Sequence, residues 1–311
     1  MLSVIQTIAP IFGVMAIGYV AVKTELMPKS AVPLLGRFVL FLALPALIFS
    51  TLAQTEVTSL IEPLYLLSYG TGSLLALMLG FGLSRLLWKE DLTRATVNGL
   101  GMSLSNSAFV GYPVLLQVYG TLPVAAFTMT LLVENLLIMP LVLIVLELSR
   151  ALAEGGDKAE VLSRFLKRVA THPILLAIVF GIGFSLTGLS LPSVIEGSLG
   201  FLANASAGVA LFVIGGSLVG MQIKGDLVRI SGIAFGKLAL HPALVALMVW
   251  LLPPFDPELQ RIAILMAAMP MLSIYPVLAG NYTDPSRYAA TLVAATLASF
   301  ASLSIVLLLL F

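Results

Sequence analysis

Two short stretches of this chain place polar groups and helix breakers inside apolar segments. The first reads SNSAFVGYP (105–113), and the second reads AMPMLSIYP (268–276). A proline inside a helix removes a backbone donor and clashes with the preceding turn, which frees main-chain carbonyls. The helical segment that follows presents unpaired N–H groups and partial positive charge, which attract an anion. The two stretches therefore predict an anion-binding site made by two broken helices.

We expect the Asn106 side chain to bind the anion, because its amide can donate two hydrogen bonds without carrying a charge. A buried Asn can instead join two membrane helices by a hydrogen bond, and this alternative stays open. Gly111, Pro113, Pro270 and Pro276 are expected to form the two breaks. The other candidates for lining a binding site are Ser105, Tyr112, Ser273, Tyr275 and Asn135.

Three ionisable side chains lie deep in apolar segments. An ionisable group at such a depth is a functional candidate by default, because burying it is costly unless it is paired, hydrated or neutral. Glu134 is a candidate proton or cation site, with a neutral or hydrogen-bonded packing acid as the alternative. Lys237 could counter the substrate charge, pair with Glu134 or snorkel to the surface. His241, followed by Pro242, fits a packed kink better than a proton relay.

The composition sets the class of the protein. Hydrophobic residues make up 59% of the chain and charged residues 10%, and the mean hydropathy is +1.09, which indicates a multi-pass membrane protein. The absence of cysteine excludes thiolate chemistry, and two histidines cannot make a His-rich metal centre. We therefore expect no metal and no cofactor. The net charge of +1 gives no reason to expect a nucleic-acid partner.

The elements that must position these residues are membrane helices of about 20 residues each. The N-terminal apolar run lacks a basic region before it, so we interpret it as a retained first helix rather than a cleaved signal. Ten such spans are expected, at 3–22, 31–53, 63–87, 95–118, 122–149, 169–189, 198–221, 227–252, 258–281 and 287–310.

The basic residues indicate how these spans are oriented, because short cytoplasmic loops carry the Lys and Arg. The loops between the spans fall into two alternating sets, and one set contains a single basic residue, Arg261. Both termini are then non-cytoplasmic, and residues 150–168 form a cytoplasmic linker. The other side holds Lys23, Lys29, Arg37, Arg85, Lys89, Arg94, Arg150, Lys158, Arg164, Lys167, Arg168, Lys224, Arg229 and Arg287.

The two halves of the chain repeat short patterns at a nearly constant offset. Tyr112-Pro113 matches Tyr275-Pro276, and both Pro10 and Gly18 match residues of the sixth span, Pro173 and Gly181. Because each half has five spans, the halves must enter the membrane with opposite orientations. We predict an inverted repeat, 1–149 and 169–311, whose fourth and ninth spans are broken and cross near the midplane. Pro45, Pro140 and Pro192 are interpreted as ordinary kinks.

At these same residues the chain resembles the auxin efflux carrier family, which includes plant PIN-formed auxin exporters and many bacterial members. NSAFVGYPVL (106–115) resembles the family's fourth-helix pattern, and PMLSIYP (270–276) resembles its ninth. Three further segments resemble its second, sixth and seventh helices: VLFLALPALIF (39–49), RVATHPILL (168–176) and ASAGVALFVIGGSL (205–218). The short linker is like that of bacterial members.

The resemblance implies an all-α fold of ten helices, like that of sodium/proton antiporters and bile-acid symporters. Helices 1, 2, 6 and 7 would form a scaffold, and helices 3–5 and 8–10 a transport domain. Asn106 matches the family's carboxylate-binding Asn, and Pro113 and Pro276 match its crossover prolines, whereas members often have Gln at the place of Glu134. The family also implies an inner-membrane location, an organic carboxylate substrate such as malonate or an auxin-like aromatic acid, and a homodimer.

The expected function is secondary transport of organic anions by an elevator-like motion. Proton coupling or uniport is favoured over sodium coupling, because no cluster of carboxylates surrounds the two broken spans. A channel would need a polar pore stripe that the spans lack. An intramembrane enzyme would need a catalytic motif that is absent. A carboxylate receptor built on a transporter fold stays open, as does a sodium-coupled symporter.

Overall fold

The computed structural model describes residues 2–55, 60–154, 167, 170–221 and 226–311. Within these ranges every regular element is helical, and a single isolated β-bridge joins Ser105 to Met271. Most of the expected linker 150–168 lies outside the described residues, and so does Lys224. The all-helical fold class is therefore confirmed for the described part of the chain.

Helical stretches coincide with all ten expected spans to within a few residues. Six of them are long and apolar enough to cross a membrane, and they begin at Ala31, Pro63, Val124, Ser193, Leu227 and Ser286. That the chain crosses ten times stays a prediction. The α-helices are α1 (Leu2–Lys23), α2 (Ala31–Phe38), α3 (Leu44–Leu52), α4 (Pro63–Leu86), α5 (Leu92–Ser103), α6 (Tyr112–Tyr119), α7 (Val124–Leu132), α8 (Met139–Glu154), α10 (Pro173–Ser185), α11 (Ser193–Ser217), α12 (Leu227–Phe235), α13 (His241–Leu251), α14 (Pro257–Ala267), α15 (Tyr275–Gly280) and α16 (Ser286–Leu310).

Four short π-helical turns occur among the described residues, three within a continuous helix and one at the start of a helical stretch, and each ends two residues before a proline. They are η1 (Val39–Ala43), η3 (Ser107–Gly111), η4 (Val133–Ile138) and η5 (Gly236–Leu240), followed by Pro45, Pro113, Pro140 and Pro242. Proline cannot donate to the turn before it and its ring crowds that turn, so the preceding turn widens. Pro45 and Pro140 are therefore more than simple kinks.

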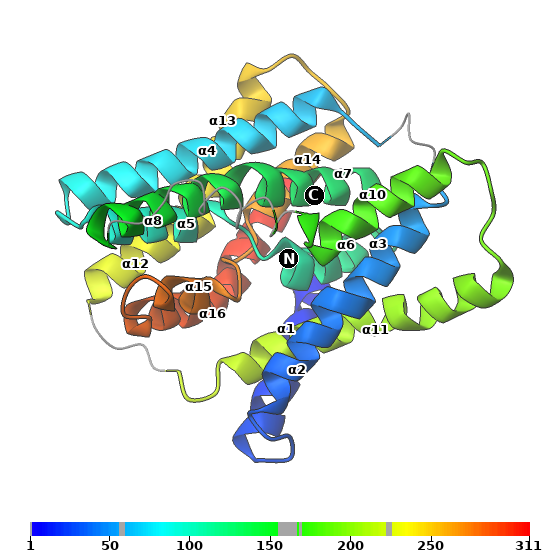
Figure 1. Ribbon diagram of the computed structural model, residues 1–311, viewed down its shortest axis with the longest axis horizontal. Helices are drawn as coiled ribbons and strands as arrows, with labels where there is room; N and C mark the ends of the chain where they lie inside the picture. Colours follow the sequence, from blue (N-terminus) through cyan, green and yellow to red (C-terminus); the bar gives the residue numbers. More distant parts are fainter. Residues whose placement is uncertain (1, 56–59, 155–166, 168–169, 222–225) are drawn as a thin grey trace. The chain divides into compact units, whose positions relative to one another are not determined.

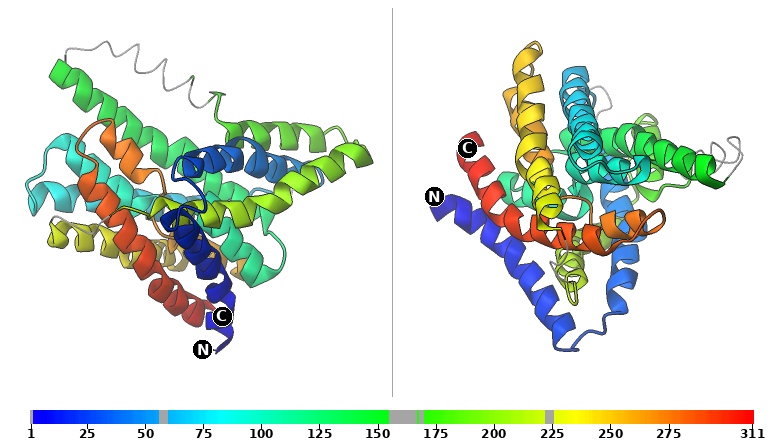
Figure 2. Two further views of the ribbon diagram at one scale, coloured as in Figure 1. Left: turned by 90° about the horizontal axis from the view of Figure 1, so that it is seen from below. Right: turned by 90° about the vertical axis from the view of Figure 1, so that its left-hand side faces the viewer.

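The chain divides into two compact units. Unit 1 comprises residues 1–62, 108–129 and 170–220. Its helices approach through glycines: α1 crosses α11 (Figures 1 and 2), and a Cβ at Gly18 would collide with the main chain of Phe212. Gly181 of α10 likewise lies against α3, where a Cβ would come within 2.8 Å of the Leu52 Cβ. Unit 1 is thus held together by close backbone packing.

Unit 2 comprises residues 63–107, 130–169 and 221–311. Within it α4 packs against α5 and α13, and α16 packs against α12 (Figure 1). The expected transport domain, helices 3–5 and 8–10, matches unit 2 except for residues 108–129, which belong to unit 1. The division into a scaffold and a moving domain stays a prediction.

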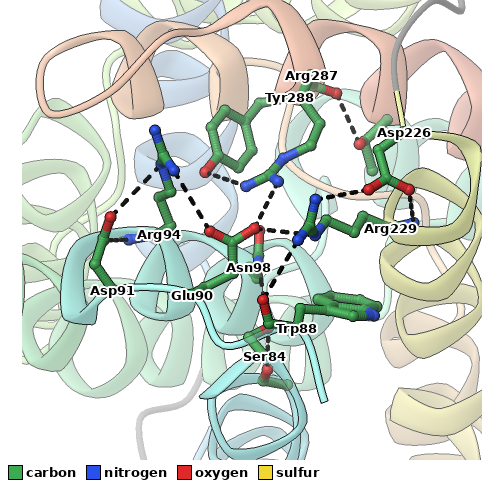
Figure 3. A network of polar contacts seen from close by, with 12 residues as sticks. Ser84, Trp88, Glu90, Asp91, Arg94, Asn98, Asp226, Arg229, Arg287 and Tyr288 are labelled. Atoms are coloured by element: carbon green, nitrogen blue, oxygen red, sulfur yellow. Dashed lines mark hydrogen bonds and ion pairs between the residues drawn. The ribbon is translucent and has the colours of Figure 1, made fainter. Parts of the chain in front are cut away.

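Glu90 lies at the centre of a charged cluster in unit 2, shown in Figure 3. Its side chain is 5% exposed. One carboxylate oxygen contacts Arg287 Nη1 at 2.7 Å and Arg229 Nε at 3.1 Å, and the other lies 3.8 Å from Arg94 Nη1. The arginines come from the starts of α16, α12 and α5. Arginines from three loops that we expected on the cytoplasmic side therefore contact the same carboxylate, that of Glu90.

Candidate functional site

The fourth expected span is broken at Leu104–Asn106. Asp91 caps the start of α5 by accepting from the Arg94 N–H at 2.8 Å, and the helix ends at Ser103, after which Leu104 is extended (φ −99°, ψ 123°). Serine and asparagine are weaker helix formers than alanine or leucine. The side chains at this break contact distant residues, Lys237, Ser273 and Glu134. Our expectation that Pro113 opens this helix is wrong, because Pro113 lies inside the helical stretch that begins at Ser107.

The ninth expected span is broken between Ala268 and Ile274. Asp256 caps α14 by accepting from the N–H groups of Glu258 and Leu259, and α14 ends at Ala267. Pro270 lies within this break, and Pro276 is the second residue of α15. A proline disfavours helical geometry in the residue before it, so Pro270 helps to keep the segment open.

The two breaks pair with each other. Ser105 and Met271 form an antiparallel bridge, and the N–H of Asn106 donates to the carbonyl of Pro270 at 2.8 Å. Backbone groups that the two helix ends leave unpaired thus satisfy one another within unit 2. This pairing fixes Ser105, Asn106 and Ser273 close together.

Asn106 is 1% exposed, and its Nδ2 lies 2.5 Å from Ser273 Oγ. Its Oδ1 has no hydrogen-bond partner among the described residues. Amide nitrogen and oxygen are interchangeable by a 180° rotation, so the hydrogen-bond pattern must decide their assignment. If the amide is turned, the Ser273 hydroxyl donates to Oδ1 and both N–H groups become free donors. A buried unpaired amide atom costs about 1–3 kcal/mol, which a bound carboxylate would relieve.

Lys237, on η5, is fully buried, and its ammonium donates in three directions. The acceptors are Ser105 Oγ at 2.8 Å, the Ala267 carbonyl at 2.7 Å and His241 Nδ1 at 2.7 Å. An ammonium has three N–H groups, so these contacts occupy all of them. Lys237 therefore neither snorkels nor has a donor left for direct contact with a substrate.

His241 has a defined role in this network. Because its Nδ1 accepts from Lys237, its Nε2 carries the proton and donates to Ser73 Oγ at 2.9 Å. Ser73 lies on α4, so the histidine joins η5 to that helix through two hydrogen bonds. This agrees with our interpretation of His241 as a packed residue.

Glu134, on η4, is 6% exposed. Its Oε1 accepts from the Tyr69 hydroxyl at 2.9 Å and from the Ser107 hydroxyl at 2.6 Å. It also interacts electrostatically with Lys237, and the main-chain N–H of Ser105 faces its carboxylate. Ser105 thus lies between the buried acid and the buried base.

Three other predicted residues have other contacts. The Asn135 amide donates to the carbonyl of Leu131 in its own helix at 2.9 Å. Tyr112 belongs to unit 1, where its ring packs on Phe127 at 5.9 Å between centroids. Tyr275 packs edge-on against Tyr288 at 5.5 Å, with its hydroxyl beside Gly101. Gly111 has ordinary helical angles, so no special backbone conformation requires glycine there.

Sequence reasoning missed the partners of these residues on α4. Tyr65, Tyr69 and Ser73 are spaced by four, so they share one face of that helix. Their partners are Thr130 at 2.6 Å, Glu134 and His241. A polar stripe at helical spacing inside an apolar span was the signal that could have identified them.

Comparisons with known proteins agree with this architecture. The family model described as membrane transport protein matches residues 3–309. A protein of Rhizobium meliloti named "Putative malonate transporter" is 26% identical over 98% of this chain and 95% of its own length. An uncharacterized transporter of Methanothermobacter thermautotrophicus is 26% identical over 96% of this chain and 95% of its own length.

A mouse protein named lysosomal cholesterol signaling protein is 26% identical over 86% of this chain, which covers 32% of that longer protein. The family match extends over nearly the whole chain, and the relatives cover the same helices. The resemblance found in the sequence is therefore confirmed: this chain belongs to the membrane transport protein family of auxin efflux carriers.

Proposed function

We propose that this protein is a secondary transporter of small organic carboxylates, which bind where the two broken spans of unit 2 pair. The main observation behind this proposal is that the Asn106 side chain is buried between the breaks and that its Oδ1 has no hydrogen-bond partner among the described residues. After rotation, its two N–H groups would bind a carboxylate while Ser273 holds the carbonyl oxygen. A neutral donor binds an anion without the strong attraction of a fixed charge, which favours release after transport.

The internal repeat supports this proposal. Of the Tyr-Pro pairs that match in sequence, Tyr275-Pro276 begins α15 directly after the second break, and Tyr112-Pro113 lies about one turn into the helical stretch that follows the first break. The matched Gly18 and Gly181 both make close helix contacts, one with α11 and one with α3. Two halves that place equivalent residues in equivalent settings fit a five-plus-five inverted repeat.

In the proposed mechanism the binding site itself moves across the membrane, and no continuous pore opens. Unit 2 carries the paired breaks, Asn106 and nearly all of the buried polar residues that the structure describes, whereas the described core of unit 1 is mainly apolar. We assign the moving role to the elements of unit 2. Two observations support the predicted orientation of the chain in the membrane. Basic residues expected on the cytoplasmic side gather around Glu90. Arg261, expected on the opposite side, lies 5.8 Å from the ring of Phe311 near the C-terminus.

A thermal-shift screen of mono- and dicarboxylates, with malonate included because of the relative's name, tests binding. Ligand should raise the melting temperature of the full-length protein in detergent. Asn106→Ala should remove that increase while the protein stays folded. Asn135→Ala is the matched control, because its amide is bonded to its own helix, and it should keep the response. An increase that survives in Asn106→Ala would place the carboxylate elsewhere.

A second function, ligand sensing without flux, has one observation in its favour. The mouse relative is named as a signaling protein, and the match covers most of this chain. Counterflow in proteoliposomes separates the two functions. A transporter exchanges labelled for unlabelled carboxylate, whereas saturable binding with no counterflow under any gradient would favour the sensor.

A further inference from the structure

Glu134 places a negative charge beside Asn106, the residue proposed to bind the carboxylate. The Ser107 hydroxyl donates to Glu134 Oε1 at 2.6 Å, and the main-chain N–H of Ser105 faces the same carboxylate. Asn106 therefore lies between two residues that both contact the acid. A carboxylate held by the Asn106 amide would lie close to Glu134, in a buried setting where like charges repel strongly.

The other titratable groups that face Glu134 leave no positive charge in excess among the described residues. Lys237, on η5, interacts electrostatically with Glu134 and balances its charge. His241 is neutral, because its Nδ1 accepts a hydrogen bond and its Nε2 donates one. Tyr69, on α4, donates its hydroxyl to Glu134, and Tyr65 stacks on Tyr69 at 6.2 Å between centroids. The net charge of these five residues is zero, and a proton that passes between Lys237 and Glu134 does not change it.

Surroundings of zero net charge accept one negative charge far more easily than two. The Asn106 amide and the N–H groups of the helical stretch that begins at Ser107 offer only partial positive charge. The three donors of Lys237 are already bonded to neutral acceptors. Neutral donors can hold a monoanion, whereas a second full charge in a buried setting needs a counter-charge or a proton.

We propose that Glu134 limits the site to one net negative charge, so that a dicarboxylate binds only together with a proton. This inference rests on the proposed function and deepens it. The proton lies either on the second carboxyl group of the ligand or on Glu134, and the two arrangements have the same total charge. A monocarboxylate binds without that proton. Transport of a dicarboxylate would thus carry one proton with each molecule.

A matched pair of ligands tests this inference: malonate and its monomethyl ester, which differ in charge and little in size. Dissociation constants are obtained from thermal-shift titrations of the full-length protein in detergent at a series of pH values. Towards alkaline pH, malonate should lose affinity relative to the ester by about tenfold per pH unit, because one more proton must be bound with it. At the acidic end, where malonate itself carries one proton, the two ligands should bind with similar affinity.

Two variants with the same substitution separate the charge of Glu134 from a general effect of pH. Glu134→Gln removes the charge and keeps an acceptor for the Tyr69 and Ser107 hydroxyls. The weaker binding of malonate at alkaline pH should then be reduced by about tenfold or more, since one like charge is gone from a buried setting. Glu147→Gln is the matched control and should keep the wild-type difference, because Glu147 is partly buried and bonded to the Tyr282 hydroxyl at 2.7 Å.

The results are read against Asn106→Ala, which should remove the response to both ligands. Malonate that binds the wild type as tightly as the ester at every pH would overturn the inference, and so would an unchanged difference in Glu134→Gln. Both of these results leave the proposed function intact, provided that Asn106→Ala removes the response. A response that persists in Asn106→Ala overturns the proposed function and this inference together. The wild-type titration tests the inference by itself, so the test does not depend on the folding of Glu134→Gln.

Discussion

The two units of the chain solve the problem of packing membrane helices in different ways. All buried polar and charged residues that the structure describes lie in unit 2, except Thr128 and Ser206. Ser206 donates to the Ala203 carbonyl of its own helix, and its side chain also interacts with Tyr112 of the same unit. Both units also use glycines that bring helices together, as at Gly18 and Gly215 in unit 1 and at Gly72 and Gly99 in unit 2. Added side-chain volume at such glycines should therefore be costly in both units, whereas changes of charge and hydrogen bonding should matter mainly in unit 2.

The largest effect is expected from the buried acid of unit 2. Glu134→Leu removes the acceptor of the Tyr69 and Ser107 hydroxyls and leaves Lys237 without a counter-charge. Each of the two buried hydroxyls then lacks its acceptor, which costs about 1–3 kcal/mol of stability per group. Glu134→Gln keeps an acceptor and should lose clearly less. Thermal unfolding in detergent compares the two variants, and equal losses would mean that the charge is unimportant.

A volume change in unit 1 should come next. A Cβ at Gly215 would overlap the main chain of Met15, whereas a Cβ at Gly208 of the same helix meets no atom within 4 Å. Gly215→Ala should cost about 1–3 kcal/mol by overpacking. Gly208→Ala should be neutral or slightly stabilising, because alanine is the better helix former. Size-exclusion profiles and melting temperatures of the two variants would test this, and similar behaviour would contradict the glycine-packing account.

A smaller loss is expected at the Glu90 cluster. Glu90→Gln removes the charge shared by Arg287, Arg229 and Arg94 but keeps an oxygen that can accept. Because the arginines are partly exposed, we expect a loss of about 1–2 kcal/mol. An Asp91→Asn variant, which alters a neighbouring exposed acid, should lose less in the same melting assay. If both variants behave alike, the cluster contributes no more than a surface ion pair.

The smallest effect concerns pH at the start of α12. The backbone N–H of Arg229 donates to Asp226 and, together with the Arg229 charge, lowers the pKa of this exposed carboxyl. A folded-state pKa below the unfolded value stabilises the protein above the unfolded pKa, and this contribution is lost as pH falls through the folded pKa. Asp226→Asn, which retains a capping side chain, should be slightly less stable than the wild type at neutral pH and should match it in acid. Melting curves across pH would show whether the difference closes.

The sequence was informative about element positions and about which residues are buried and polar. Apolar runs located the helices, and Asn106, Ser105 and Ser273 lie together as their stretches predicted. The place of the first break was mispredicted, because α5 ends at Ser103 and the chain is helical again from Ser107, well before Pro113. The polar stripe on α4 marked candidate partners, but local pattern could not show which residues contact Glu134 and Lys237, since those partners come from helices far apart in the chain.

The π turns alter how a span presents its faces. An α-helix turns by about 100° per residue, so a turn that holds one extra residue rotates everything after it by that angle. The sequence positions that face the protein interior therefore follow one helical register before the π turn and a shifted register after Pro140 or Pro242. A single helical wheel drawn over 124–150 or 227–251 mixes two phases. Removing one residue of η4 or η5, rather than replacing its proline, would bring the two phases back into register.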